Sequence, residues 1–437
     1  MSGLLYSLQE LVASNPLVRA GLLIGFSLAL VLQIVPVMIW LERKLCAYIQ
    51  DRIGPNRAAL FGMIRAGGFF HTITDALKLL TKEDIRPVQA NKGLFLLAPF
   101  LVVAPVLLTV AVLPWADDVV LADGRRVPMQ IAQLDVGLLY IFAVAGLTVF
   151  GILLAGWASN NKYSLLGGLR AASQLVSYEV GLTLAAVSLM VTFETVKLEQ
   201  MVTLQEGWRL GVVFQPIAFV IFLVATFAES NRVPFDLPEG ESELVAGYHT
   251  EYTGFKFALF MLAEYVHMIV SSVVIACVFF GGWQVPGLPT AELKANIVPV
   301  LRGGLVAGAS VSILLAIVCL RRYLVGPHRW KDRGDLEPAF WGTILLVAGA
   351  VQIALAIAGV TRIPADAVPW LAAFVQFNML MMKAGFFLFL YLWVRWTLPR
   401  FRFDQVMRLG WKMLMPIALA NIVITAAVVT FGGRIFS

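Results

Sequence analysis

The chain has 437 residues, of which 59% are hydrophobic and only 14% are charged, and its formal net charge is +6. Soluble domains carry about a quarter charged residues, so this composition excludes an ordinary soluble protein and indicates one surrounded by lipid. The three cysteines and four histidines are scattered, without a CxxC pair or a Cys/His cluster. This distribution argues against a metal, haem or iron–sulfur site in the chain, and we interpret the cysteines as apolar packing residues.

Ten stretches are long and apolar enough to cross a membrane as helices, which takes about 20 residues each. The amino terminus lacks the basic start of a cleavable signal, so we expect the first stretch to be retained as a span. The sequence therefore predicts an all-α, polytopic integral membrane helix bundle that forms a single transmembrane domain over residues 1–437. The predicted spans are residues 22–40, 94–114, 138–158, 175–194, 211–228, 257–280, 300–320, 340–360, 371–394 and 413–431.

The lysines and arginines are distributed unevenly between the two sides of this bundle. The loops on one side hold 23 of them, whereas the opposite loops and both tails hold 9, counting Arg302 at the end of a span. The positive-inside rule places the first set in the cytoplasm and both termini on the other side of the membrane. The predicted cytoplasmic loops are residues 41–93, 158–174, 229–256, 321–339 and 395–412.

The first cytoplasmic loop contains an amphipathic segment at residues 60–82, divided at Gly67–Gly68. One face carries Phe69, Phe70, Ile73, Leu77 and Leu80, and the other carries His71, Asp75, Lys78 and Lys82. The segment is too short and too polar to span, so we predict an interfacial helix that Pro87 ends. On the other side of the membrane, an Asp-Gly turn is expected at Asp123–Gly124.

Five ionisable residues fall inside or at the end of predicted spans, where a charge costs about 3 kcal/mol. They are Glu179, Glu229, Glu264, His267 and Lys383. Glu264 and His267 are three residues apart and therefore share one helix face. Each residue could serve a functional site, or could be a structural ion pair or a side chain that reaches to the interface.

The loop after the fifth span is the most informative stretch. Six acidic residues lie between Glu229 and Glu251, offset only by Arg232, and Pro234 and Pro238 prevent a continuous helix. Like charges this close raise the pKa values of some carboxyl groups, so the loop could hold and pass protons near neutral pH. A solvated acidic loop explains the composition equally well.

Four motifs resemble the membrane subunit of complex I that is known as NADH dehydrogenase subunit 1 in mitochondria, and its bacterial equivalent. The longest runs from Ala228 through Arg232, Phe235 and Tyr252 to Tyr265. The other three are Glu42-Arg43-Lys44 followed by residues 50–56, residues 76–83, and residues 399–412. All four occur in the family's order and lie on the predicted cytoplasmic side. The resemblance covers about 1–280 and 371–431.

The resemblance implies a membrane subunit of proton-pumping NADH:quinone oxidoreductase that encloses a chamber for ubiquinone or menaquinone. It implies no catalytic residue and no redox centre in this chain, with NADH, FMN and iron–sulfur clusters bound by partner subunits. The expected partners are the peripheral quinone-site and terminal-cluster subunits, small membrane subunits, antiporter-like subunits and lipid, but no nucleic acid. The expected location is the bacterial inner membrane.

Carried onto this sequence, the family pattern implies two sets of site residues. Arg43, Arg52, Asp75 and Arg232 would line the chamber or its entrance, with Phe235 as apolar wall. An acidic route from the chamber towards the antiporter-like subunits would consist of Glu179, Glu229, Asp236, Glu239, Glu241, Glu243 and Glu264.

The chain also departs from the usual family pattern of about eight spans. Residues 281–370 add two spans joined by a basic loop, and we expect this transmembrane hairpin to lie at the periphery, against lipid or a neighbouring subunit. The basic loop would suit anionic headgroups.

Two rival interpretations remain. A related subunit of membrane-bound hydrogenases lacks a quinone chamber, and the long first cytoplasmic loop disfavours it. A secondary transporter would show paired broken helices in two inverted halves, which the sequence lacks, and it would purify alone rather than with many partners.

Overall fold

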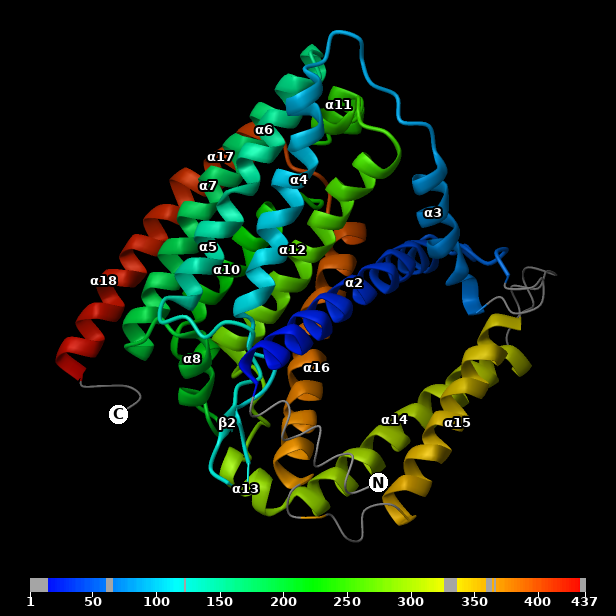
Figure 1. Ribbon diagram of the computed structural model, residues 1–437, viewed down its shortest axis with the longest axis vertical. Coiled ribbons are helices and arrows are strands. Elements are labelled where there is room, and N and C mark those ends of the chain that lie inside the picture. Colours follow the sequence, from blue (N-terminus) through cyan, green and yellow to red (C-terminus); the bar gives the residue numbers. More distant parts are fainter. Residues whose placement is uncertain are drawn as a thin grey trace.

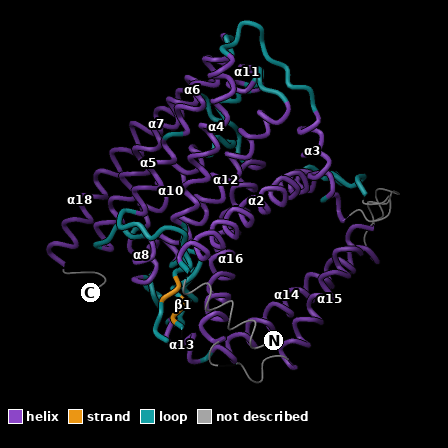
Figure 2. The backbone as a smooth tube through the Cα atoms, in the orientation of Figure 1, coloured by secondary structure: helices purple, strands orange, loops and turns teal. Residues whose placement is uncertain are grey.

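The computed structural model describes residues 15–59, 66–121, 123–325, 336–358, 364 and 367–432. Most of these residues are helical (Figure 2). Within the described part, nine helices are long and apolar enough to cross a membrane, and one shorter apolar helix accompanies them. The predicted all-α, polytopic membrane fold is confirmed.

The first half of the chain packs into a slanted bundle (Figure 1). Helix α2 begins at Pro16, where the side chain of Asn15 accepts hydrogen bonds from the amides of Leu17 and Val18 and so caps the helix. The helices and strands of this half are α2 (Pro16–Ile49), η1 (Ala66–Gly68), α3 (Phe70–Thr81), α4 (Lys92–Thr109), η2 (Val110–Val112), β1 (Val119–Val120), β2 (Arg126–Val127), α5 (Gly137–Gly146), α6 (Thr148–Ala158), α7 (Lys162–Phe193) and α8 (Leu198–Leu204).

The second half completes the bundle and adds a helical hairpin beside it. Helix α12 is the most deeply buried span of the described residues, with 89% of its apolar window inside the protein. The elements are α9 (Gly211–Phe214), α10 (Pro216–Glu229), α11 (Glu241–Leu244), η3 (Gly247–His249), α12 (Gly254–Phe280), α13 (Thr290–Ala295), α14 (Ile297–Val325), α15 (Glu337–Ala358), α16 (Val368–Thr397), α17 (Phe403–Arg408), η6 (Leu409–Leu414) and α18 (Met415–Gly432).

The predicted fifth span, 211–228, is not one continuous helix. It breaks between α9 and α10 at Gln215, because Pro216 cannot donate a backbone hydrogen bond. The buried Gln215 amide donates to the hydroxyls of Thr192 and Thr425, each at 2.9 Å, and accepts from Asn421 at 3.0 Å. These polar partners compensate for the interrupted helix within the bundle.

Two other predicted boundaries also differ. Helix α2 continues to Ile49, so the loop predicted to begin at residue 41 begins about nine residues later. The amphipathic helix α3 ends at Thr81 instead of at Pro87, because the backbone of Lys82 is already extended. Gly254, at the start of α12, packs against the carbonyl groups of Leu79 and Lys82 at this point. Residues 60–65 of the predicted amphipathic segment lie outside the described residues.

Three apolar side chains of α3 are largely exposed among the described residues. Ile73, Leu77 and Leu80 are 48%, 56% and 60% exposed. Beyond the opposite ends of the spans, the external loop forms a two-stranded antiparallel ladder in which Val119 pairs with Val127. Gly124 has a φ of +81° in the turn between the strands, where the Asp-Gly turn was predicted.

Helices α14 and α15 form a hairpin that stands apart from the bundle over most of its length (Figure 1). The two helices approach closely because Gly342 packs on Leu320 and Gly349 packs on Ile313. Only 11% and 17% of their apolar windows are buried, against 89% for α12. The hairpin touches the remainder of the described protein near its two ends, at α13 and α16 at one end and at α2 and η1 at the other.

Candidate functional site: a buried network of charges

Helix α2 carries one carboxylate into the interior of the bundle. Glu42 is 7% exposed and accepts a hydrogen bond of 2.9 Å from the hydroxyl of Tyr265 on α12. Its other oxygen contacts the guanidinium of Arg395 on α16 and lies 3.6 Å from Arg232. The charge of Glu42 is therefore balanced by two arginines from distant parts of the chain.

Arg232 lies at the centre of this network. Its guanidinium is 3.4 Å from Glu264 on α12 and 4.5 Å from the centre of the Tyr265 ring. Glu264 also accepts a hydrogen bond of 3.3 Å from the hydroxyl of Tyr248. Because Glu42, Glu264 and Arg232 are all buried, solvent screens the interactions between their charges only slightly.

The loop between α10 and α12 is folded against α7. The amide of Gln174 donates to the carbonyl oxygens of Ala228 and Phe235, at 2.7 and 2.9 Å. Phe235 is buried between the rings of Tyr178 and Phe401. These contacts hold a loop rich in acidic residues against the interior of the protein.

Asp236 extends the charged network towards the end of α16. Its carboxylate accepts a hydrogen bond of 2.5 Å from Arg400. Burial, reinforced by the neighbouring charge of Glu239, nevertheless raises the pKa of Asp236 to about 7. Burial and the nearby charges of Glu264 and Glu239 also raise the pKa of the Tyr248 hydroxyl well above its ordinary value. Asp236 can therefore gain and lose a proton near neutral pH.

A small cavity continues the network into the membrane-spanning part of the bundle. Its volume is about 40 Å³, which is room for about three or four water molecules at roughly 10–15 Å³ each. Its polar lining comes from Glu179, Glu229, Asn231, Tyr248, Glu264 and His267. The arrangement can hold water among ionisable groups.

Two carboxylates face this cavity from its far side. Glu229, at the end of α10, lies 3.3 Å from His267 on α12. Glu179 on α7 occupies the space beside Gly146, where a larger side chain would collide with its carboxylate. The structure thus brings Glu179, Glu229 and Glu264 to one cavity.

Glu239 and Glu243, two further acidic residues of the predicted route, lie nearer the surface. Glu239 is half-buried and close enough to influence Asp236 and Tyr248. Glu243 is 55% exposed and pairs with Arg170 at 2.6 Å. Glu241 begins α11, and its side chain lies outside the described part of the protein.

The residues predicted for the chamber do not form one cluster. Arg43 on α2 pairs with Asp75 on α3 at the surface of the protein, with side chains 47% and 30% exposed. Arg52 is exposed and donates to Gln50 at 2.7 Å. Arg232 instead joins the acidic residues of the interior.

Lys383, the remaining charge predicted inside a span, has a distinct environment. Its amino group donates to the carbonyl oxygens of Phe280, Gly282 and Gln284, at 2.7, 2.8 and 2.7 Å. All three ammonium donors are therefore used at the carboxyl end of α12. The geometry is that of a cap for this helix end.

Within the described residues, no group of three or more His, Cys, Asp or Glu side chains could hold a metal ion. Cys46 and Cys277 are buried free thiols, and Cys319 is half-buried.

Sequence reasoning missed four residues of the network: Glu42, Arg395, Arg400 and Tyr265. Glu42 belongs to a motif recognised in the sequence, but the first span was predicted to end at residue 40. Helix α2 continues about two and a half turns beyond residue 40, and within a helix Glu42 and Arg43 are separated by about 100° around the axis. No pattern local to residues 395–400 indicates their partners, which lie more than 150 residues away in sequence.

The sequence that folds into this network matches a known protein family. A model of the NADH dehydrogenase family covers residues 22–426. The chain belongs to the NADH dehydrogenase family.

Curated relatives of similar length agree with this assignment. The chain is 37% identical to an NADH-quinone oxidoreductase subunit of Cytophaga hutchinsonii, over 88% of this chain and 89% of the relative. It is 40% identical to an NADH-quinone oxidoreductase subunit of Solibacter usitatus, over 90% of this chain and 92% of the relative. It is also 40% identical to NADH-quinone oxidoreductase subunit 8 of Rhodothermus marinus, over 89% of this chain and 91% of the relative.

These matches confirm the resemblance found in the four sequence motifs. The chain is a multi-pass membrane subunit of an NADH–quinone oxidoreductase complex, and its partners are other subunits of that complex. The transporter interpretation is wrong, because the match extends over nearly the whole chain.

Proposed function

We propose that this subunit encloses part of the quinone chamber and starts the proton-coupling route of the complex. The observation that carries the proposal is a buried series of charges that leads from Asp236 to the cavity at Glu179. Between them lie Arg395, Glu42, Arg232 and Glu264. A membrane protein retains such a series only at a high energetic cost, which favours a functional role.

The chemistry of quinone reduction gives this series a task. A quinone takes up two electrons and two protons to become a quinol, so its reduction changes both the charge and the proton balance nearby. Glu42 and Glu264 share Arg232, and the charge of Arg395, which pairs with Glu42, also acts on Asp236. A change at one site therefore alters the protonation of the others. Waters in the cavity would carry the response to Glu229 and Glu179.

The chamber lies, in this proposal, between α2, α3 and the loop of residues 230–253. Arg43, Asp75 and Arg52 would border its membrane-facing side, and Phe235 would support its wall from behind. The quinone is ubiquinone or menaquinone. Peripheral partner subunits bind NADH, FMN and the iron–sulfur clusters, and antiporter-like subunits receive the coupling signal.

We further propose a bacterial inner-membrane location with the loops of α2–α4 and α10–α12 in the cytoplasm. The bias in lysine and arginine supports this orientation, and the curated relatives named above are bacterial proteins.

Glu239→Gln tests the coupling proposal directly. Glu239 borders Asp236 and Tyr248, so removing its charge should lower quinone-coupled proton pumping in the assembled complex to less than about half. NADH oxidation with ferricyanide should be unchanged, because that reaction bypasses the quinone chamber. Pumping is measured as the pH gradient formed in proteoliposomes per NADH oxidised.

Glu251→Gln is the matched control. It removes a carboxylate from the same loop, but one that accepts a hydrogen bond of 2.6 Å from Asn161 and does not belong to the predicted acidic route. Normal pumping in Glu239→Gln, or equal losses in both variants, would refute the acidic route.

A further inference from the structure

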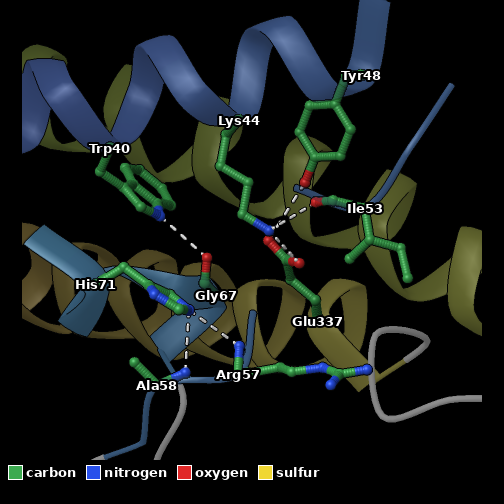
Figure 3. A network of polar contacts seen from close by, with 9 residues as sticks. All are labelled: Trp40, Lys44, Tyr48, Ile53, Arg57, Ala58, Gly67, His71 and Glu337. Carbon is green, nitrogen blue, oxygen red and sulfur yellow. Dashed lines mark hydrogen bonds and ion pairs between the residues drawn. The ribbon is translucent and has the colours of Figure 1, made fainter. Parts of the chain in front are cut away.

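The hairpin of α14 and α15 is attached at one end by a buried ion pair (Figure 3). Glu337, the first residue of α15, lies 2.6 Å from the amino group of Lys44 on α2, and both side chains are less than a tenth exposed. Lys44 also donates to the carbonyl oxygen of Ile53 at 3.1 Å, and Tyr48 donates to Glu337 at 3.3 Å. The pair therefore joins the hairpin to both α2 and the loop that follows it.

One turn further along α15, Trp341 packs directly on the segment that precedes α3. A side chain on Gly67 would place its Cβ 2.6 Å from the indole nitrogen of Trp341. The indole of Trp40, whose ring centre lies 5.6 Å from that of Trp341, donates to the Gly67 carbonyl at 3.0 Å. Gly67 has a φ of +58°, so the fit depends on glycine at this position.

The same segment is connected onward to α3. Gly68 packs against the carbonyl of Pro55, where any side chain would collide. On α3, His71 accepts hydrogen bonds from the amides of Arg57 and Ala58, at 3.1 and 3.0 Å. An uninterrupted set of contacts thus leads from Glu337 to the start of α3, the helix that carries Asp75.

A buried ion pair is a costly way to attach a hairpin whose other surfaces are apolar. Desolvating two charges opposes the attraction between them, and well-packed apolar residues commonly give equal or greater stability. The ion pair does, however, fix a geometry. The amino group of Lys44 that pairs with Glu337 also donates to the carbonyl oxygen of Ile53, so the position of Glu337 is tied to that of Ile53. The energetics thus favour a role in positioning over one in anchorage alone.

We propose that Glu337 is a positioning residue for quinone access: through Lys44 and Gly67 it holds residues 53–58 and α3 at the edge of the chamber. This inference rests on the proposed function and assigns a role to the hairpin. An isoprenoid tail must stay threaded past this edge while the headgroup is bound. Displacing the edge should therefore impair binding of long-tail quinones more than that of short analogues.

The test compares Glu337→Gln with wild type in the purified, assembled complex. The KM for a long-tail ubiquinone or menaquinone should rise at least about threefold, as expected when part of a charge-assisted hydrogen bond is lost. The KM for ubiquinone-1 and the ferricyanide activity should stay unchanged. A general loss of structure would instead lower all three activities together.

Asp117→Asn is the matched control at the opposite end of the hairpin. Asp117 pairs with Lys294 of α13 at 3.3 Å, so this variant loosens the hairpin without touching the α3 segment. Its KM values should equal those of wild type. An equal rise in both variants would show that the hairpin acts only as an anchor, and would overturn the proposal.

Trp341→Phe provides a second variant should Glu337→Gln prevent assembly, because it alters the contact with Gly67 without leaving a buried charge unpaired. A selective rise in the long-tail KM supports the proposal, and an unchanged KM refutes it. Failure of the wild-type complex to reduce any quinone would instead refute the proposed function.

Discussion

Glu42 and Arg43 are consecutive residues of α2 that belong to two different electrostatic regions. Glu42 points into the bundle, where two arginines and the hydroxyl of Tyr265 surround its carboxylate. Arg43 points to the surface and pairs with Asp75 on α3. The rotation of about 100° between neighbours on a helix is enough to separate them.

The contrast between Glu42 and Arg43 distinguishes buried ion pairs from exposed ones. Exposed pairs contribute about 0–1 kcal/mol, because solvent competes for both charges. Removing one member of a buried pair costs about 3–5 kcal/mol, because the remaining charge cannot be hydrated. Substitutions in the interior should therefore affect stability and coupling together, whereas substitutions at the edge should affect quinone binding alone.

The largest expected effect is that of Arg232→Ala, because it leaves Glu42 and Glu264 buried with only Arg395 nearby. The loss of about 3–5 kcal/mol should appear as a marked fall in the temperature at which the purified complex is inactivated. Quinone reductase activity should fall at least about tenfold. Both are measured on the assembled complex by NADH oxidation with quinone after timed heating.

A second substitution shows whether an unbalanced buried charge causes the loss of heat resistance in Arg232→Ala. Adding Glu264→Gln to Arg232→Ala removes the carboxylate that has lost its arginine partner, whereas Glu42 keeps Arg395, so the double variant should be more heat-resistant than the single one. Full quinone reductase activity together with unchanged heat resistance in Arg232→Ala would eliminate the distinction between the two regions.

Asp236→Asn should change the pH dependence of stability. The pKa of Asp236 is raised to about 7 in the folded protein, against about 3.9 for an unperturbed Asp. Its favourable contribution is thus fully present below about pH 4 and is lost as the pH rises through 7. Wild type should lose heat resistance between pH 5 and 8, and the variant should lose less, because Asn mimics the protonated carboxyl group.

Asp84→Asn is the control, since a hydrogen bond from Lys256 lowers the pKa of Asp84. Asp84 stays ionised between pH 5 and 8, so its removal should leave the slope of heat resistance against pH as in wild type. Parallel curves for wild type and Asp236→Asn would show that Asp236 does not titrate in this range.

The fold was largely predictable because lipid imposes a simple rule on length and polarity. Helices such as α12 and α16 follow it closely. The rule failed where polar side chains are satisfied by partners distant in sequence. Gln215 is paired with Thr192, Asn421 and Thr425 at the break before α10, and Glu42 lies in a helix that continues beyond its apolar stretch.

The candidate site was predictable in the acids that fall inside spans and in Arg232, but not in Glu42, Arg395 or Arg400. Glu179, Glu229 and Glu264 stand out in the sequence because charges inside spans are rare. Arg395 and Arg400 follow a predicted span, where cations are common. Arg400 lies in the motif of residues 399–412, but nothing local indicates the carboxylate partner of either arginine. Arg232 lies in the buried network, whereas Arg43 and Asp75 pair at the surface. This difference depends on the rotation of residues around a helix and on the folding of a loop, which the motifs do not reveal.

The smallest effect is expected for Arg43→Ala. Its pair with Asp75 is half-exposed and should contribute no more than about 1 kcal/mol, so heat resistance should stay close to that of wild type. The KM for quinone should nevertheless rise about two- to threefold, as befits loss of one exposed polar contact at the chamber edge. Arg125→Ala, which breaks a similarly exposed pair with Asp123 in the external loop, should change neither quantity. A drop in heat resistance as large as that of Arg232→Ala would show that Arg43 belongs to the buried network, and an unchanged KM would remove Arg43 from the chamber.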